Sequence, residues 1–374
     1  MAKKTKKQLT LENALAGPAS QETWDRICSA LTRWREPSLS EEAIPLALEA
    51  LAEWPASTPR PPAASWRKRL IKGEDDPRML LCNTLEFENG PKKPTADELA
   101  ALQDSPAFER LTNIHTLTFH RAALQYAALD LWLHAPSLTG VRHLTLHNHA
   151  YGSCAPQRTS FHGESERLTQ LVYSPRAKTL ETLALQSNWL EARDAKHLVK
   201  SDCWGALKRL DLHNNNLGPA GAKVLAKASA LSNIEELELG YNNIGAAGLE
   251  ALVKSKNFPR LRRLGLRSNI RDKELLALVD TPLMNQLEEL DLWGSWITDE
   301  TLSALVHSPT CSNLRSLDMI CNKLTKQGAL MLASTPHLES LRSLTVDTRE
   351  MGLEGREVLE DWSSNSPELE IHYH

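Results

Sequence analysis

The chain has 374 residues, of which 41% are hydrophobic and 24% charged, as in an ordinary folded protein. Its length exceeds that of one usual core, so we expect two compact units or one elongated array. The formal net charge of −4 argues against the strongly basic surface of a nucleic-acid-binding protein. The sequence contains no apolar run of about 18 residues, which argues against a transmembrane helix and against a membrane partner.

The first residues and the cysteines favour a cytoplasmic protein. Residues 1–10 carry a short run of lysines, which we expect to be a solvated tail, and no apolar segment of the kind found in secretory signals. The six cysteines follow no disulfide or metal-ligand spacing. We therefore expect them to be reduced and mostly buried.

Residues 1–80 are predicted to be helical. Trp24, Ile27, Leu31 and Trp34 are spaced for one face of a helix, and the proline-rich residues 55–62 predict a loop or linker. We expect this segment to be a small cap that covers the apolar end of the first coil, with a docking module of its own as the alternative. Residues 81–110 are expected to form a transition and a first irregular coil.

Residues 111–374 contain an internal repeat. Apolar residues recur with the spacing seen at Leu207, Leu210, Leu212 and Leu217. Successive repeats begin 27 residues apart, except for an interval of 26 before Leu287. Clear copies begin at Leu180, Leu207, Ile234, Leu261, Leu287, Leu314 and Leu341. Weaker copies at Ile114 and Val141, and a last strand at Ile371 and Tyr373, suggest about ten coils.

Each repeat predicts a strand, a helix and a return loop. Alternation at Leu210 and Leu212 indicates a strand with one buried face, and Gly221, Val224 and Leu225 follow with helical spacing. Strands repeated in this way run parallel. Because one unit cannot bury its own apolar face, the units must stack. We therefore predict an α/β solenoid shaped as a curved horseshoe, with a parallel concave sheet and convex helices.

The pattern LxxLxLxxNxL, with Gly221, Gly248 and Gly328, resembles the leucine-rich repeats of the ribonuclease-inhibitor-like class. The resemblance covers about residues 111–374. It implies that one asparagine per coil bonds backbone groups at the turn after the strand, here Asn188, Asn215, Asn242, Asn269 and Asn322. Four coils depart from the pattern, so we expect this asparagine ladder to be broken at Ala122, His149, Ser295 and Arg349.

A second resemblance concerns residues 66–81. Their sequence is similar to a small helical companion domain that precedes repeats in some bacterial proteins, and this implies a bacterial source. The residues that match are Trp66, Gly73, Asp76, Pro77 and Arg78.

Charged residues alternate in sign from strand to strand. Two residues after each start stand Arg209, Glu236, Arg263 and Glu289, and the preceding residues alternate in the same way. Neighbouring strands lie about 4.8 Å apart, so these side chains are expected to form cross-strand pairs. Partner binding is the alternative. Alternating signs argue against a nucleic-acid groove, which would keep one sign.

Trp293 and Ile320 stand six residues after the first apolar residue of their repeats, at a position where side chains should face solvent. With Tyr241 and Trp296 they predict an apolar patch of the kind that anchors a protein interface. The alternative is that Trp296 turns inward beside Ser295 and is covered by Trp293. The predicted partner-binding residues are His213, Tyr241, Arg263, Arg267, Asp291, Trp293, Trp296 and Ile320.

Histidines cluster in the first coils. His143, His147 and His149 share one strand and its turn, and His120 should lie beside His147. Imidazoles on adjacent strands could bind zinc, and the insertion at residues 151–170 adds Cys154 and His162. No compact metal spacing is present, so a pH-sensitive patch, or no role, is the favoured interpretation, and no cofactor is expected.

Known catalytic signatures are missing from the sequence. We therefore expect a non-catalytic scaffold or adaptor that binds a protein on its concave face. One alternative, implied by related repeat proteins, is a regulator of an enzyme, either an inhibitor or a GTPase activator. Another is a metal-binding or enzymatic site at the histidine-rich coils.

Overall fold

The structure is a computed structural model that describes residues 4–55, 57–87, 105–120, 129–147 and 165–374, together with residues 98 and 102. The chain divides into two compact units, Met1–Gly152 and Ser153–His374. The expected boundaries after residues 80 and 110 stay predictions. Among the described residues, no helix combines the length and the apolar character that crossing a bilayer requires.

The first unit begins with helices. They are α1 (Lys6–Leu15), α2 (Gln21–Leu31), α3 (Ile44–Leu51) and α4 (Ala64–Ile71). The apolar face of α2 is buried as predicted, through Trp24, Ile27 and Leu31. The indole of Trp24 donates a hydrogen bond to the carbonyl of Pro61 at 2.7 Å and meets the Trp66 ring edge-on, with centroids 6.3 Å apart.

A buried ion pair follows α4. Both Asp76 oxygens accept hydrogen bonds from the guanidinium of Arg78 at 2.7 Å, and this guanidinium lies over the Trp66 ring at 5.4 Å. Asp76 also accepts the backbone N–H of Arg78, so it starts the 3-10 helix η2 (Pro77–Leu81). Trp66, Asp76 and Arg78 of the companion-like motif therefore pack together.

The remaining described part of the first unit carries parallel strands. They are β1 (Thr84–Phe87), β2 (Thr116–His120) and β3 (His143–His147), accompanied by the short helix α6 (Pro106–Glu109) and the 3-10 helix η3 (Pro136–Gly140). Leu85, Leu117 and Leu144 stand in register and are buried, and Phe87 stacks on Phe119 with centroids 4.9 Å apart.

The second unit is a regular array of strands and helices. Its strands are parallel and adjacent in chain order: β4 (Thr182–Ala184), β5 (Arg209–Asp211), β6 (Glu236–Glu238), β7 (Arg263–Gly265), β8 (Glu289–Asp291), β9 (Ser316–Met319), β10 (Ser343–Val346) and β11 (Glu370–Tyr373). Its α-helices are α8 (Ser165–Val172), α9 (Ala192–Lys200), α10 (Gly218–Leu225), α11 (Gly245–Val253), α12 (Pro282–Gln286), α13 (Asp299–Val306), α14 (Lys326–Ser334) and α15 (Gly352–Asn365).

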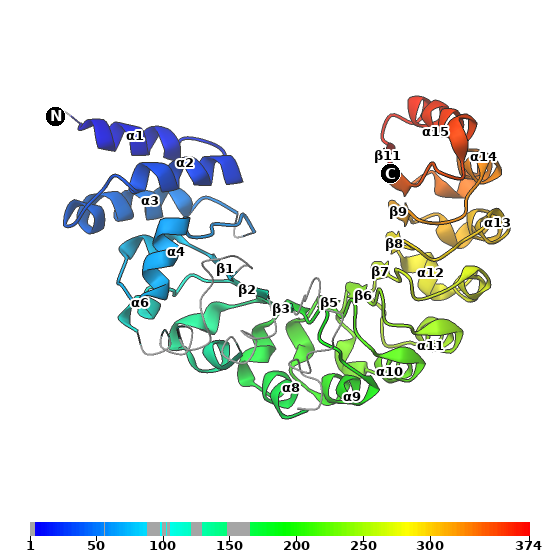
Figure 1. The fold of residues 1–374 in the computed structure, drawn as a ribbon, viewed down its shortest axis with the longest axis horizontal. Coiled ribbons are helices and arrows are strands. Elements are labelled where there is room, and N and C mark those ends of the chain that lie inside the picture. Colours follow the sequence, from blue (N-terminus) through cyan, green and yellow to red (C-terminus); the bar gives the residue numbers. More distant parts are fainter. Residues whose placement is uncertain are drawn as a thin grey trace. The chain divides into compact units, whose positions relative to one another are not determined.

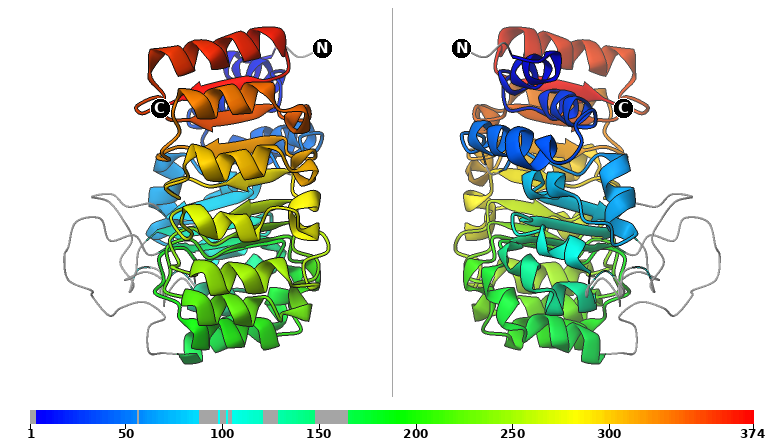
Figure 2. Two further views of the ribbon diagram at one scale, coloured as in Figure 1. Left: turned by 90° about the vertical axis from the view of Figure 1, so that its right-hand side faces the viewer. Right: turned by 90° about the vertical axis from the view of Figure 1, so that its left-hand side faces the viewer.

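Within this unit the strands line the inner side of a curve and the helices form its outer layer (Figures 1 and 2). The leucines three residues after each start pair across the sheet and are buried, as the repeat predicts: Leu210, Leu237, Leu264, Leu290, Leu317 and Leu344. Burying such side chains contributes about 1.5–3 kcal/mol each, so stacking supplies most of the driving force. The predicted α/β solenoid is therefore confirmed.

The helices of the outer layer approach closely at a small residue. A Cβ atom at Gly248 of α11 would lie 2.9 Å from the Cβ of Ala222 and 3.4 Å from the Cα of Pro219, both in α10. Gly221, Gly328 and Gly355 hold the same repeat position. The coil of residues 261–286 has Glu274 there, and it forms the 3-10 helix η7 (Asp272–Ala277) followed by the short helix α12.

Candidate functional site

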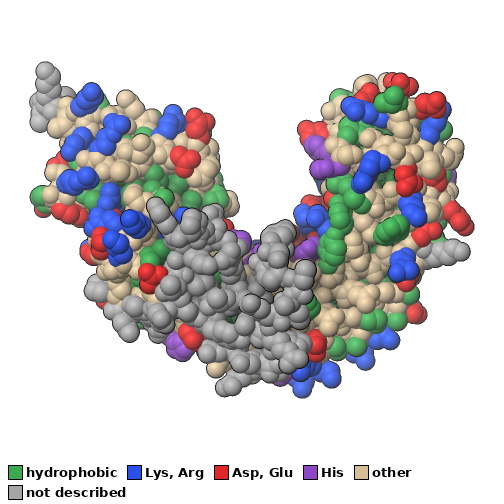
Figure 3. All heavy atoms as spheres, in the orientation of Figure 1, with side chains coloured by type: hydrophobic (Ala, Val, Ile, Leu, Met, Phe, Trp, Pro, Cys, Tyr) green, Lys and Arg blue, Asp and Glu red, His purple; other side chains and the backbone are tan. Residues whose placement is uncertain are grey.

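The candidate site lies on the concave face of the second unit. Counting the first apolar residue of a coil as position 0, the side chains at positions +2, +4 and +6 project from this face, whereas those at +3 and +5 are buried. Hydrophobic side chains also gather along the inner edge over β7 to β9 (Figure 3). The site therefore combines charged residues, mainly at +2 and +4, with apolar residues at and after +6.

The +2 row forms the predicted cross-strand pairs. Arg209 pairs with Glu236, with nitrogen and oxygen 2.8 Å apart, and Arg263 pairs with Glu289 at 2.7 Å. All four side chains are exposed by more than a third, so each pair stabilises the sheet by at most about 1 kcal/mol. A role of Arg263 in partner binding stays a prediction.

The +4 row is acidic, and only Asp291 of this row was predicted from the sequence to be functional. Each carboxylate accepts the backbone N–H of the residue two positions later, at 3.0 or 3.1 Å; the carboxylates belong to Asp211, Glu238, Asp291 and Asp318. Such bonds fix the chain as it leaves the strand. The recurrence of an acid at this position, interrupted by Gly265, was visible in the sequence.

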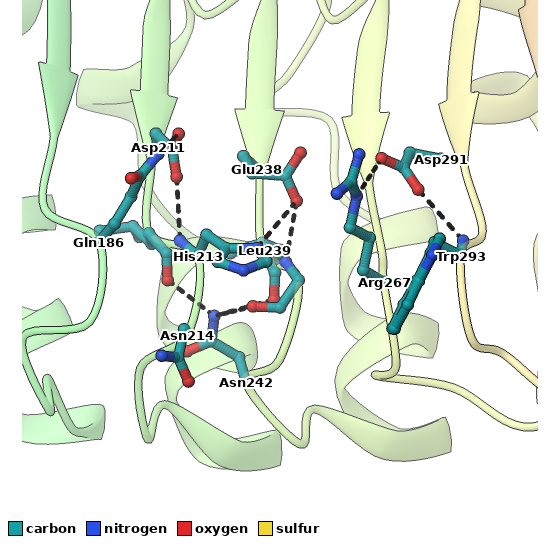
Figure 4. A network of polar contacts seen from close by, with 12 residues as sticks. Gln186, Asp211, His213, Asn214, Glu238, Leu239, Asn242, Arg267, Asp291 and Trp293 are labelled. Carbon is teal, nitrogen blue, oxygen red and sulfur yellow. Dashed lines mark hydrogen bonds and ion pairs between the residues drawn. The ribbon is translucent and has the colours of Figure 1, made fainter. Parts of the chain in front are cut away.

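Glu238 occupies space that two glycines leave open. A Cβ atom at Gly265 would collide with the Glu238 carboxylate, and one at Gly240 would lie 2.6 Å from Nδ1 of His213. This nitrogen is 3.9 Å from Oε1 of Glu238 (Figure 4). Burial opposes ionisation of Glu238, but His213, the N–H of Gly240 and the charge of Arg267 outweigh it, so its pKa lies below the usual value.

Arg267 connects two further carboxylates. Its Nε donates a hydrogen bond to Asp291, and its Nη2 lies 3.8 Å from Oδ2 of Asp318. Burial raises the pKa of Asp291, and the neighbouring charge of Asp318 adds to this effect, although Arg267 and the N–H of Trp293 oppose it. Figure 4 shows Trp293 beside the aliphatic stem of Arg267. The Arg267 guanidinium thus forms ion pairs with two carboxylates, those of Asp291 and Asp318.

The residues predicted to form an apolar patch are Tyr241, Trp293, Trp296 and Ile320, and each of them is exposed or half-buried. Tyr241 is 39% exposed, and its ring lies 5.7 Å from that of Trp293 and 5.2 Å from that of His213. Ile320 and Trp293 are half-buried. Trp296 is 60% exposed, with Nζ of Lys323 4.8 Å from its ring centre.

The alternative in which Trp296 turns inward is wrong. Ser295 takes the buried position, and Trp296 has a φ of 56°, which directs its side chain outward. A bulky side chain in this left-handed region is uncommon. Trp189, which was not among the predicted site residues, has the same φ, stands nine residues after its coil start as Trp296 does, and is 50% exposed. The shared repeat position is the signal that would have identified it.

The asparagine ladder confirms the implied role of these residues. Nδ2 of Asn242 donates to the carbonyls of Leu212 and Leu239 at 2.8 Å, and Asn215, Asn269 and Asn322 bond neighbouring turns in the same manner. The ladder is interrupted at Ser295, whose buried hydroxyl has no partner within the described part of the chain. Arg349 instead pairs with Asp347. The predicted breaks at Ala122 and His149 lie outside the described residues.

Two of the histidines meet as predicted. The rings of His120 and His147 lie 5.7 Å apart on β2 and β3, and Nε2 of His120 is 2.8 Å from Oε1 of Glu86. His143 stands at the start of β3, opposite Thr116. His149, Cys154 and His162 lie outside the described residues, as do residues 151–164 of the insertion. The residues that can be described contain no group of three or more side chains able to hold a metal ion.

Comparisons with known proteins agree with this architecture. Residues 207–226, 230–253 and 310–333 match the family described as Leucine Rich repeat. A solved structure of the Rad7 and Elc1 complex from yeast is similar, with a TM-score of 0.53 and 16% identity over 90% of this chain and 82% of that chain. An internalin, InlF, from Listeria monocytogenes has a TM-score of 0.36 and 16% identity over 75% and 84% of the two chains. No curated protein matches the sequence. Leucine-rich repeats are therefore confirmed.

Proposed function

We propose that this chain is a non-catalytic scaffold or adaptor that binds a protein partner on the concave face of Ser153–His374. Repeat solenoids use their extended concave surfaces for such binding. The observation that carries the proposal is the apolar patch of Tyr241, Trp293, Trp296 and Ile320. The similar yeast structure is itself that of a complex of two proteins, which is consistent with this role.

The apolar patch has the properties of an interface anchor. Trp and Tyr are the side chains most enriched among residues that dominate binding energy. Tyr241 and Trp293 already touch each other, and Lys323 lies against Trp296, so these rings lose little freedom when a partner covers them. Large exposed aromatics otherwise have an unfavourable contact with water.

The charge around this patch favours a basic partner surface. On β5 to β9 and the turns after them, the three concave rows hold six carboxylates and three guanidinium groups, namely Asp211, Glu236, Glu238, Glu289, Asp291 and Asp318 against Arg209, Arg263 and Arg267. Arginine or lysine side chains of a partner would compensate this excess. We therefore propose a partner with apolar and basic residues side by side.

We also propose the class of the repeats, the nature of the N-terminal segment and the cellular location of the protein. The ribonuclease-inhibitor-like class is supported by the period of 27 residues and by the helices of the outer layer. A companion motif at residues 66–81, and with it a bacterial source, is supported by the packed unit around Asp76 and Arg78. A cytoplasmic location is supported by free thiols at Cys28, Cys82 and Cys311, whose pKa values burial raises.

The test is quantitative co-purification of partners with the immobilised full chain and its variants. We expect Trp296→Ala to reduce recovery of the specific partner about tenfold or more, as for an aromatic anchor. Trp189→Ala is the matched control, because it removes a similarly exposed tryptophan with the same φ from a different coil. Equal recovery with both variants and with the original chain would contradict the proposal.

A further inference from the structure

The last strand of the second unit, β11, lies at the end of the sheet in this unit (Figure 1). It pairs with β10, and within the described part of the chain no strand lies along its other edge. The N–H of Glu370 donates to the carbonyl of Arg342 at 2.8 Å. The N–H of His374 donates to the carbonyl of Val346 at 3.0 Å. Because alternate residues of a strand bond to opposite sides, the N–H and C=O of Ile371 point away from β10.

An edge strand of this kind attracts other strands unless the protein protects it. The first strand of the first unit, β1, has such protection, because the guanidinium of Arg67 donates to the carbonyl of Glu86 at 3.1 Å. Among the residues that the structure describes, no side chain bonds the backbone of β11 in this way. The hydroxyl of Ser363 bonds the carbonyl of Leu369, which precedes the strand. The outer edge of β11 therefore offers backbone donors and acceptors to another strand.

The core side of β11 is less covered than that of the strand before it. Leu344 and Val346 of β10 are fully buried, whereas Ile371 and Tyr373, which pair with them, are half-buried. The guanidinium of Arg356 lies over the Tyr373 ring at 4.8 Å, so α15 covers this side of the strand in part. A further strand beside β11 would bury apolar surface that is now exposed.

The sequence around β11 is complementary to itself when two copies run antiparallel. If Ile371 stands opposite Ile371 of a second copy, Glu370 stands opposite His372 and Leu369 opposite Tyr373. The acid then meets a histidine, and apolar residues meet apolar residues. A two-fold axis through the Ile371 pair creates all of these contacts twice, as the symmetry of a homodimer requires.

The backbone geometry agrees with this register. Because Ile371 points its backbone groups outward, the two copies of it can exchange two hydrogen bonds. Glu370 and His372 then occupy the flanking non-hydrogen-bonded positions, where Cα atoms lie about 4.5 Å apart and side chains meet closely. A register centred on Glu370 or on His372 would instead place two glutamates or two histidines opposite each other, which is unfavourable.

We propose that β11 is a homodimer interface, in which the edge strands of two copies of this chain pair antiparallel about Ile371. A second copy is the occupant that the charges select. Glu370 and His372 lie on the same face of the strand, 3.9 Å apart, with side chains 80% and 55% exposed, so both can reach a neighbouring strand. The interface shares no residue with the concave apolar patch, so it can be tested separately from the proposed function.

The test is sedimentation velocity of the full chain and its variants over a series of concentrations. We expect a reversible dimer. His372→Glu places two carboxylates opposite each other in both flanking pairs and should raise the dimer dissociation constant about tenfold or more. Glu370→Lys removes the acid opposite His372 and should also weaken the dimer. His307→Glu is the matched control, because His307 is exposed directly after α13, and it should leave the constant unchanged.

Mixing the two weakened variants tests the register itself. In a mixed dimer of His372→Glu with Glu370→Lys, one flanking pair joins the introduced glutamate to the introduced lysine. The other flanking pair keeps the original glutamate and histidine. We expect the mixture to associate about tenfold more tightly than either variant alone. An effect of either substitution on folding would not produce this recovery.

The opposite outcomes are equally clear. A chain that stays monomeric at every concentration would overturn the proposal, in favour of an extended segment of another protein as the occupant of the edge. A dimer that neither variant weakens, or that His307→Glu weakens equally, would place the interface elsewhere. Weakening by both variants without recovery in the mixture would reject the antiparallel pairing about Ile371.

Discussion

Glu238 and Asp291 stand in the same row of the concave face, yet their pKa values move in opposite directions. Both carboxylates are largely buried and both accept a backbone N–H. Glu238 faces His213 and Arg267, whereas Asp291 has the negative Asp318 beside it on the next strand. The balance between burial and neighbouring charge, and not the residue type, therefore decides the direction.

This balance predicts how Glu238 affects stability with pH. Because its pKa is lower in the folded than in the unfolded chain, ionised Glu238 stabilises the fold above the ordinary value near 4.5. That contribution disappears as the pH falls through the folded-state pKa. Glu238→Gln should lower the free energy of unfolding by about 1 kcal/mol at neutral pH, and the difference should vanish in acid.

Urea unfolding at a series of pH values measures this effect. Glu236→Gln, which removes a more exposed carboxylate from the same strand, serves as the control and should change stability less. A difference between Glu238→Gln and the original chain that stays constant down to acid pH would show that the charge of Glu238 is not responsible.

At the scale of single elements, the asparagine ladder joins each turn to the next. Asn242 is fully buried, and its side chain bonds four backbone groups in two coils: Nδ2 donates to the carbonyls of Leu212, Leu239 and Gly240, and Oδ1 accepts the N–H of Leu217 at 3.4 Å. Ser295, at the same position of a later coil, is equally buried but has no hydrogen-bond partner among the described residues. The same repeat position is therefore strongly stabilising in one coil and not in another.

Asn242→Ala should lower the free energy of unfolding by about 2 kcal/mol or more, because buried backbone groups lose their partners. Ser295→Ala should leave stability unchanged or raise it slightly, since the lost hydroxyl was buried without a partner. Thermal unfolding of the two variants side by side provides the comparison. Equal destabilisation by both would contradict the ladder as the source of the effect.

The sequence allowed the register of the sheet to be predicted, because apolar residues at +3 and +5 and asparagine at +8 recur at a fixed period. The orientation of Trp296 could not be predicted, since nothing in a tryptophan signals a positive φ. The two short helices η7 and α12 in residues 261–286, in place of one longer α-helix, were also unexpected. This coil is one residue shorter than its neighbours and has Glu274 where α10, α11 and α14 have glycine, and the close contact at that position becomes visible only in the packing of α10 and α11.

At the scale of the whole molecule, the second unit has its strands on the inner side of the curve and its helices on the outer side. The concave face has aromatic side chains and an excess of carboxylates. The first unit contributes a helical segment and the histidines of β2 and β3. A scaffold of this kind would hold a protein segment on the strand side of the repeat array.

The central claim, that a protein binds at the concave apolar patch, is tested most directly by photo-crosslinking. A benzophenone amino acid replaces Trp293 in the full chain, and in a second variant it replaces Leu330, which is exposed on α14 of the outer layer. After irradiation in the cells of origin, we predict a discrete crosslinked protein from position 293 that is missing from position 330. No crosslinked protein at position 293, or the same set from both positions, would contradict the account.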